Sequence, residues 1–435
     1  MKAVRRLVVL AAGIAALAAA PHAFAAQPYP LNFKTFDLSG GTRAGLTYSG
    51  GALRLGTPID TFNYTDPFAN YSGDGANGSG EYAYGTWTSA PTLLDFQFNE
   101  LVASWNAQTP PGTWIQVEVS PQMDDGHWAK WYILGRWAYG DTDTHWAPGD
   151  ADFHRTSVGG QGDKDGYVAI DTFFAKDHPA IAYQLRLTLY RRTTTTATPS
   201  VTRLSAIASN LRNQKNTFPS AKMNSQAVDL GVTSFSQEIH HGDYPQFDNG
   251  GEAWCSPTST AMVVDTWGYS PDPSNYQYVY DDPLYGPNHP DAVVDFTAKQ
   301  VYDYHYNGAG NWPFNTAYAA AQGLVADVTM LHNLREAETF IKTYEVPLVA
   351  SVAWSSNKLD NAIKSTNGHL LVIGGFTEDG NVIAYDPAHD TDAQVRQIYD
   401  REQFERAWIP ASGGIVYVDR PAGTLPEAAL TANNS

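Results

Sequence analysis

Gly250-Gly-Glu-Ala-Trp-Cys-Ser-Pro-Thr-Ser-Thr-Ala-Met-Val-Val-Asp-Thr-Trp-Gly268 is the most informative stretch of the chain, and it holds Cys255, the single cysteine among 435 residues. Pro257 fits only the first turn of a helix, and the serine and threonines around it are common helix-start residues. Residues 261–267 are apolar on most faces. We therefore predict a helix buried in a domain core, with Cys255 at its amino end.

The position of Cys255 predicts a reactive thiol. The amino end of a helix carries partial positive charge, which favours a thiolate, and a neighbouring imidazolium would favour it further. A lone cysteine can form no intrachain disulfide, and a cysteine used only for packing would more naturally lie inside the helix. Cys255 is thus predicted to be a nucleophile.

A thiolate nucleophile needs a proton partner, and His369 is the best candidate. It opens the segment Asn367-Gly-His-Leu-Leu-Val-Ile-Gly-Gly-Phe376, whose later residues are almost all apolar and predict a strand entering the core. A histidine at the open end of such a strand, downstream of the cysteine, suits a catalytic base. The histidines at 240, 241 and 389 lie in polar, turn-like stretches and are weaker candidates.

Asp386 is our choice for the group that orients the base, because it closes the next predicted strand. Asn367 and Asp390 are also candidates for this role. A tight hairpin centred on residues 379–380 would pair Asp386 with Ile373, which leaves His369 four residues away, roughly 13 Å along the strand. Direct contact then requires a longer loop, strong coiling, or an irregularity at residues 374–375.

An acyl-transfer site also needs a donor for the developing oxyanion. Gln237 and Gln246 both precede the nucleophile, and the backbone N–H of Cys255 could be the second donor. The sequence does not decide between the two glutamines.

The chain around this segment divides into regions of different character. Short alternating runs with frequent turn residues predict an antiparallel β-sandwich or jelly roll in the first half, and helix-like stretches followed by strands predict an α+β domain in the second. The predicted regions are a signal peptide (1–25), the β-sandwich accessory domain (26–208), a linker (209–228), the α+β domain (229–421) and a disordered tail (422–435).

The signal peptide predicts a secreted, extracellular protein with no membrane span. The formal net charge of −18 makes nucleic acid and anionic membranes poor partners. No metal or cofactor is expected, because the histidines lack metal-ligand spacing such as HExxH and no phosphate-binding glycine loop is present. The sandwich is rich in tryptophan, which we interpret mainly as core, although a cell-wall or glycan ligand would also account for it: Trp87, Trp105, Trp114, Trp128, Trp131, Trp137 and Trp146.

Residues 229–421 resemble the papain-like cysteine peptidase superfamily, and most closely the double-glycine leader (bacteriocin-processing) peptidases in an exported, stand-alone form. The resemblance is carried by Ser236-Gln237, Trp254-Cys255-Ser-Pro-Thr-Ser-Thr, Gly368-His369-Leu-Leu-Val-Ile and Asp386-Pro387. It implies a papain-like fold with Gln237 as oxyanion donor, Cys255 as nucleophile, His369 as base and Asp386 as its orienter. Gln237 precedes Cys255 by more residues than is usual in that family, and no transporter segments follow.

The expected function is therefore cleavage of peptide bonds in a peptide or protein substrate through a thioester acyl-enzyme. Transglutaminase-like acyl transfer and cell-wall amide hydrolysis share the same order of cysteine, histidine and aspartate. A catalytically inactive surface or glycan-binding protein is a further hypothesis.

Overall fold

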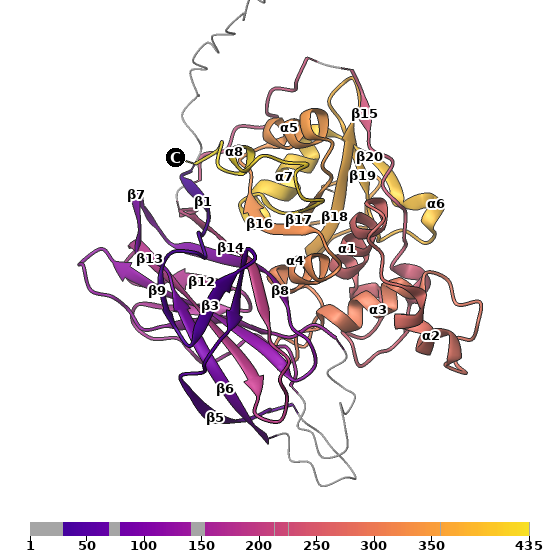
Figure 1. Ribbon diagram of the computed structural model, residues 1–435. Helices are drawn as coiled ribbons and strands as arrows, with labels where there is room; N and C mark the ends of the chain where they lie inside the picture. Colours follow the sequence, from indigo (N-terminus) through magenta and orange to yellow (C-terminus); the bar gives the residue numbers. More distant parts are fainter. Residues whose placement is uncertain are drawn as a thin grey trace, which may run out of the picture.

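The first half of the chain folds into two antiparallel sheets of seven strands each (Figure 1). The computed structural model describes residues 29–68, 79–140, 153–212, 214–224, 226–356 and 358–434. One sheet runs β11-β12-β8-β14-β4-β3 with β1 on β14, and the other runs β10-β9-β13-β6-β2 with β5 on β6 and β7 on β13. The strands are β1 (Leu31–Thr35), β2 (Thr42–Ala44), β3 (Leu46–Ser49), β4 (Ala52–Leu55), β5 (Asp60–Thr65), β6 (Ser79–Thr88), β7 (Thr92–Phe98), β8 (Glu100–Gln108), β9 (Thr113–Met123), β10 (Tyr132–Trp137), β11 (Gly166–Ala169), β12 (Thr172–Ala175), β13 (Ala180–Arg192) and β14 (Ser200–Ser209).

Tryptophan in this half mostly fills the core, as the sequence indicated. Trp87, Trp105, Trp114 and Trp137 are each at most 1% exposed, whereas Trp128 is 38% exposed. Trp146 lies outside the described residues. A polysaccharide ligand for this domain stays a prediction, which a pull-down on insoluble glycans would test.

The second half is built around a third seven-stranded antiparallel sheet, ordered β16-β21-β17-β18-β19-β20 with β15 on β18. Helices α5 and α7 pack on it, and α1 and α4 lie on its other side (Figure 1). The strands are β15 (Val228–Asp229), β16 (Val325–Met330), β17 (Leu348–Trp354), β18 (Thr366–Phe376), β19 (Val382–Tyr385), β20 (Arg396–Tyr399) and β21 (Ile415–Arg420). The helices are α1 (Cys255–Thr266), α2 (Gln277–Asp281), α3 (Ala292–Val301), α4 (Trp312–Ala321), α5 (Leu334–Tyr344), α6 (Asp392–Val395), α7 (Arg401–Ser412) and α8 (Glu427–Leu430), with the short 3₁₀ helices η1 (Glu238–His240), η2 (Gly251–Ala253) and η3 (Pro273–Tyr276).

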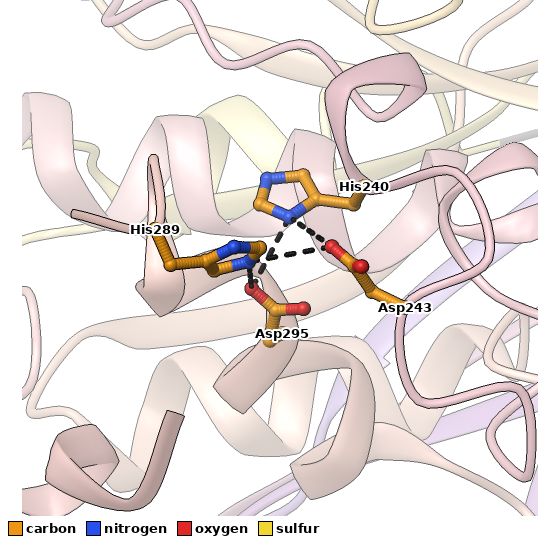
Figure 2. Close-up of side chains that lie close together, drawn as sticks. All are labelled: His240, Asp243, His289 and Asp295. Carbon is orange, nitrogen blue, oxygen red and sulfur yellow. Dashed lines mark hydrogen bonds and ion pairs between the residues drawn. The ribbon is translucent and has the colours of Figure 1, made fainter. Parts of the chain in front are cut away.

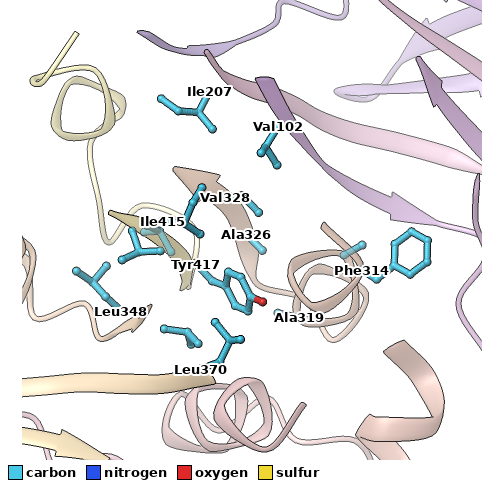
Figure 3. Packing of buried hydrophobic residues seen from close by; sticks show 14 of the residues in the cluster. Val102, Ile207, Phe314, Ala319, Ala326, Val328, Leu348, Leu370, Ile415 and Tyr417 are labelled. Carbon is cyan, nitrogen blue, oxygen red and sulfur yellow. The ribbon is translucent and has the colours of Figure 1, made fainter. Parts of the chain in front are cut away.

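The two halves share one hydrophobic core. Val102 and Ile207 of the sandwich lie close to Val328 and Ala326 of the edge strand β16 (Figure 3). Asn106 on β8 also donates to the carbonyl of Ala326 (2.7 Å) and accepts from its N–H (3.2 Å). Sandwich side chains therefore satisfy backbone groups that an edge strand would otherwise leave open.

The end of the chain corrects one prediction. We expected residues 422–435 to be disordered, but Glu427–Leu430 form α8 within this stretch, and Leu430 is only 3% exposed. Asn434 hydrogen-bonds both backbone groups of Phe33 on β1, and Glu427 pairs with Arg203. The tail is held in place because its few apolar and charged side chains find partners on the sandwich, which composition alone does not reveal.

The structure does not test the predicted signal peptide or the predicted domain limits. The signal peptide lies outside the described residues. Strand β14 ends at Ser209 and β15 begins at Val228, while the domain limits themselves stay predictions. Within the described part of the chain, no helix is both long and apolar enough to cross a bilayer.

Candidate active site

Cys255 is the first residue of α1, as the sequence predicted, and its side chain is partly exposed. The preceding residue, Trp254, is fully buried, and its indole N–H donates to the carbonyl of Phe247 (2.5 Å). The next nine residues of the helix are buried as well, so the helix is anchored in the core. The thiol is therefore held at the positive end of a fixed helix dipole.

His369 lies on β18, opposite Val352 of β17. The residue is 3% exposed, and Trp354 packs edge-on against its imidazole with ring centroids 5.9 Å apart. The thiol of Cys255 is near enough to this ring to raise the pKa of His369. The structure thus brings the predicted nucleophile and the predicted base together.

Asp386 is fully buried and contacts the other side of the imidazole. Its Oδ1 lies 2.7 Å from Nε2 of His369 and also accepts from the N–H of Ala388 (3.0 Å). Its Oδ2 accepts from the hydroxyl of Tyr399 at 2.6 Å. Because Nε2 is engaged by the carboxylate, Nδ1 is the ring nitrogen left for Cys255.

His369 and Asp386 each stabilise the charged form of the other. Burial alone would lower the pKa of His369, but Asp386 and Cys255 together raise that pKa to about 10. Burial alone would raise the pKa of Asp386, yet His369, Tyr399 and the N–H of Ala388 lower it to about 2. The pair is therefore an imidazolium and a carboxylate at neutral pH, and an imidazolium beside a thiol promotes thiolate.

A bulge in β18 makes the contact between His369 and Asp386 possible. The register between β18 and β19 shifts between Ile373 and Gly375, so Tyr385 pairs with Val372. Asp386 then falls opposite position 371 rather than 373, only two residues from His369, roughly 7 Å along the strand. The sequence allowed direct contact between His369 and Asp386 through a longer loop, strong coiling or an irregularity at residues 374–375. The structure contains the irregularity.

Replacing Gly375 with alanine is expected to destabilise the fold by about 1–3 kcal/mol. A Cβ at Gly375 would lie 2.3 Å from the carbonyl oxygen of Val228, which is backbone and cannot swing away. Gly368 on the same strand is the matched control, because a Cβ there meets nothing within 4 Å. Urea unfolding of both variants measures the effect, and equal midpoints for the two would show that the bulge tolerates a side chain.

Of the two candidate oxyanion glutamines, Gln237 lies at the site. It is 3% exposed, its N–H donates to the carbonyl of Pro387 (3.0 Å), and its Nε2 donates to the carbonyl of Glu252 (2.9 Å), three residues before the cysteine. Gln246 is exposed. The placement favours Gln237, while its role stays a prediction.

Asn367 and Asp390, the two further candidates for orienting the base, lie outside this hydrogen-bonded group. Both are exposed, and neither is bonded to His369. The assignment of Asp386 as the group that holds the imidazole is therefore the one that the contacts support.

Three aromatic side chains surround the histidine–aspartate pair. His389 is near it, with Nε2 3.9 Å from Oδ2 of Asp386, but the hydroxyl of Tyr399 lies closer to that oxygen. Tyr399 and Trp354 were not predicted, because a tyrosine and a tryptophan in apolar strands give no signal that separates site from core.

A cysteine at the start of a buried helix, with a histidine–aspartate pair on the adjoining sheet, is an arrangement typical of cysteine hydrolases. Residues 230–416 match the Peptidase_C39 like family, and residues 32–209 match the Peptidase C39 N-terminal domain. Each half of the chain is therefore similar to a different domain of the C39 peptidases.

Comparison with individual proteins adds little. No curated protein matches the chain. A crystal structure of the CBM22-1 and GH10 modules of Clostridium thermocellum endo-1,4-beta-D-xylanase 10B with xylohexaose is 14% identical, covers 48% of this chain and 32% of its own, and gives a TM-score of 0.16. The chain thus spans about a third of that structure's length, and so weak a superposition supports no inference.

Proposed function

We propose that this protein is a secreted cysteine peptidase with a papain-like catalytic domain. The observation that carries the proposal is the His369 imidazole held at 2.7 Å by the buried Asp386 carboxylate, with the Cys255 thiol near enough to raise the pKa of that histidine. The relation to cysteine peptidases, and a nucleophile helix packed on the sheet that bears the base, support the same assignment. Export is inferred from the first 25 residues of the sequence.

The proposed reaction starts from a thiolate on Cys255 and an imidazolium on His369. The sulfur attacks the peptide carbonyl carbon, and the oxyanion that forms accepts hydrogen bonds from the backbone N–H of Cys255 and the side chain of Gln237. His369 gives its proton to the leaving amine as the C–N bond breaks, which leaves a thioester. Water, deprotonated by His369, then attacks the thioester, releases the carboxylic acid and restores the thiolate–imidazolium pair.

Gln237 must reorient to serve as an oxyanion donor. Its amide N–H₂ group donates to Glu252 and to Glu238 (3.1 Å), whereas its Oε1 is buried without a partner. Rotation of the side chain on substrate binding would exchange these bonds for one to the substrate. Catalytic hydrogen bonds often form only in the substrate complex.

The proposal is tested by mass spectrometry of a peptide library incubated with the protein before and after treatment with iodoacetamide. Because the chain has one cysteine, alkylation modifies a single known side chain. We expect new peptide termini with the untreated protein and none after alkylation. Cleavage that survives complete alkylation would exclude the thiol mechanism.

The same assay, repeated with an added amine and with peptidoglycan, separates the two competing enzyme classes. Products that carry an added amine in place of a new carboxylate would indicate transglutaminase-like transfer, and release of fragments from peptidoglycan alone would indicate cell-wall amide hydrolysis. Failure of iodoacetamide to label the folded protein would favour an inactive binding protein.

A further inference from the structure

Two histidines and two aspartates from two stretches of the chain, 240–243 and 289–295, form a second polar cluster (Figure 2). His240 ends η1, Asp243 follows it, His289 lies in the loop before α3, and Asp295 lies in the first turn of α3. One potential ligand atom from each side chain lies within 4.8 Å of all the others. His240 is 0%, Asp295 1% and Asp243 9% exposed, and His289 is half-buried, so three of the four side chains are buried.

The distances within the cluster match a four-coordinate metal site. Nδ1 of His240 lies 3.1 Å from Oδ2 of Asp295 and 3.4 Å from Oδ2 of Asp243. Nε2 of His289 lies 3.0 Å and 3.3 Å from the same two oxygens. Ligands about 2.0 Å from a tetrahedral Zn²⁺ are separated by roughly 3.3 Å, so these four nitrogen–oxygen distances suit four of the six edges.

Hydrogen bonding within the protein leaves the cluster incompletely satisfied. His289 makes one aligned bond, to Asp295. Nδ1 of His240 points between two carboxylates without an aligned hydrogen bond, and Oδ2 of Asp243 and Oδ1 of Asp295 also have no hydrogen-bond partner. Buried polar atoms without partners are costly and rare. Nδ1 of His240 and Oδ2 of Asp243 face each other and Oδ2 of Asp295 inside the cluster, where a cation would satisfy them.

The charge balance leads to the same conclusion. Two carboxylates with two neutral imidazoles would place two uncompensated negative charges in a buried site, whereas one divalent cation makes the site neutral. Two bound protons, one on each imidazole, are the competing way to reach neutrality. Imidazole and carboxylate together are ligands that zinc accepts, and four protein ligands leave no open position for catalysis.

We propose that His240, Asp243, His289 and Asp295 bind one structural Zn²⁺-like divalent ion. The ion would join η1 to α3. Gln237 directly precedes η1, and Gly251, in the turn before Cys255, packs so tightly that a Cβ there would lie 2.2 Å from the carbonyl oxygen of Gln237 and 2.5 Å from the carbonyl carbon of His240. The metal would thus fix the segment that carries Gln237; this positioning role rests on the proposed function, whereas the metal site does not.

The test uses tag-free protein carrying Cys255→Ser, so that the thiol beside His369 cannot bind zinc. After chelator treatment, exposure to Zn²⁺ and gel filtration, we expect one zinc per chain by elemental mass spectrometry. Saturating zinc should raise the Tm by roughly 5 °C or more over the chelated protein. Co²⁺ in place of zinc should give the intense visible absorption of four-coordinate cobalt.

Asp295→Asn and His289→Gln should each lower the bound zinc at least about tenfold. His332→Gln is the matched control, because His332 is another buried histidine paired with a carboxylate, Glu336 (2.9 Å), outside the cluster. The control should keep one zinc per chain even if its Tm falls. Absence of stoichiometric zinc together with a Tm that zinc leaves unchanged would overturn the proposal and assign the cluster to protonated histidines. Zinc retained by both cluster variants would overturn it as well.

Discussion

Replacing Cys255 with alanine is expected to lower kcat for peptide-bond cleavage by about 10⁴-fold or more. The reason is that the chain holds no other cysteine, so that no thioester can form and His369 has only water to activate. What remains would be binding and oxyanion stabilisation, which act without a covalent intermediate. The measurement is kcat on a peptide found in the library screen.

A loss of activity is informative only if the fold survives. The Cys255 side chain is partly exposed and small, so the variant should unfold at nearly the same urea concentration as the parent. His241→Gln is the activity control, since the His241 side chain is 72% exposed and takes no part in the contact from Cys255 to Asp386. Retention of more than about a tenth of the activity by the alanine variant would contradict the assignment of Cys255 as nucleophile.

The catalytic residues could be proposed from sequence because their signals are local. A lone cysteine followed by a helix-start pattern gave the start of α1, and the apolar run after His369 gave β18. The contact between His369 and Asp386 has no such local signal, because it depends on the bulge in β18. Two consecutive glycines marked a position where the register could slip, but only the packing of Gly375 against the Val228 carbonyl shows that it does.

What the sequence could not supply are contacts between distant segments. The ligands of the proposed metal site come from residues 240–243 and 289–295, which are distant in sequence and lack a spacing such as HExxH, and His240 alone resembled a polar turn residue. The tail looked disordered by composition, yet it is fixed by Arg203 and by the backbone of Phe33. Such pairings depend on how the sandwich packs against the second domain, and patterns in a single sequence do not indicate that packing.

The interface between the two domains contains a buried carboxylate, that of Asp327 on β16. It is 0% exposed, its Oδ1 pairs with Arg203 (2.7 Å) and accepts from Ser205 (2.6 Å), and its Oδ2 pairs with Arg420 (3.0 Å). Burial alone would raise the pKa of Asp327, but the two arginines lower it, so the group stays charged. Arg203 and Ser205 belong to β14 of the sandwich and Arg420 to β21, so one carboxylate serves both domains.

Asp327→Asn is therefore expected to reduce the free energy of unfolding by about 3 kcal/mol or more, because it leaves Arg420 buried without a counter-charge. Asp419→Asn is the matched control on the neighbouring strand. Asp419 is also buried, burial raises its pKa well above the usual range, and its carboxyl oxygens have no hydrogen-bond partner, so an amide replaces a neutral group at a cost below about 1 kcal/mol. Urea unfolding followed by tryptophan fluorescence measures both variants. Equal losses would mean that the arginines are satisfied without Asp327, and a second transition in Asp327→Asn would show that this ion pair couples the unfolding of the two domains.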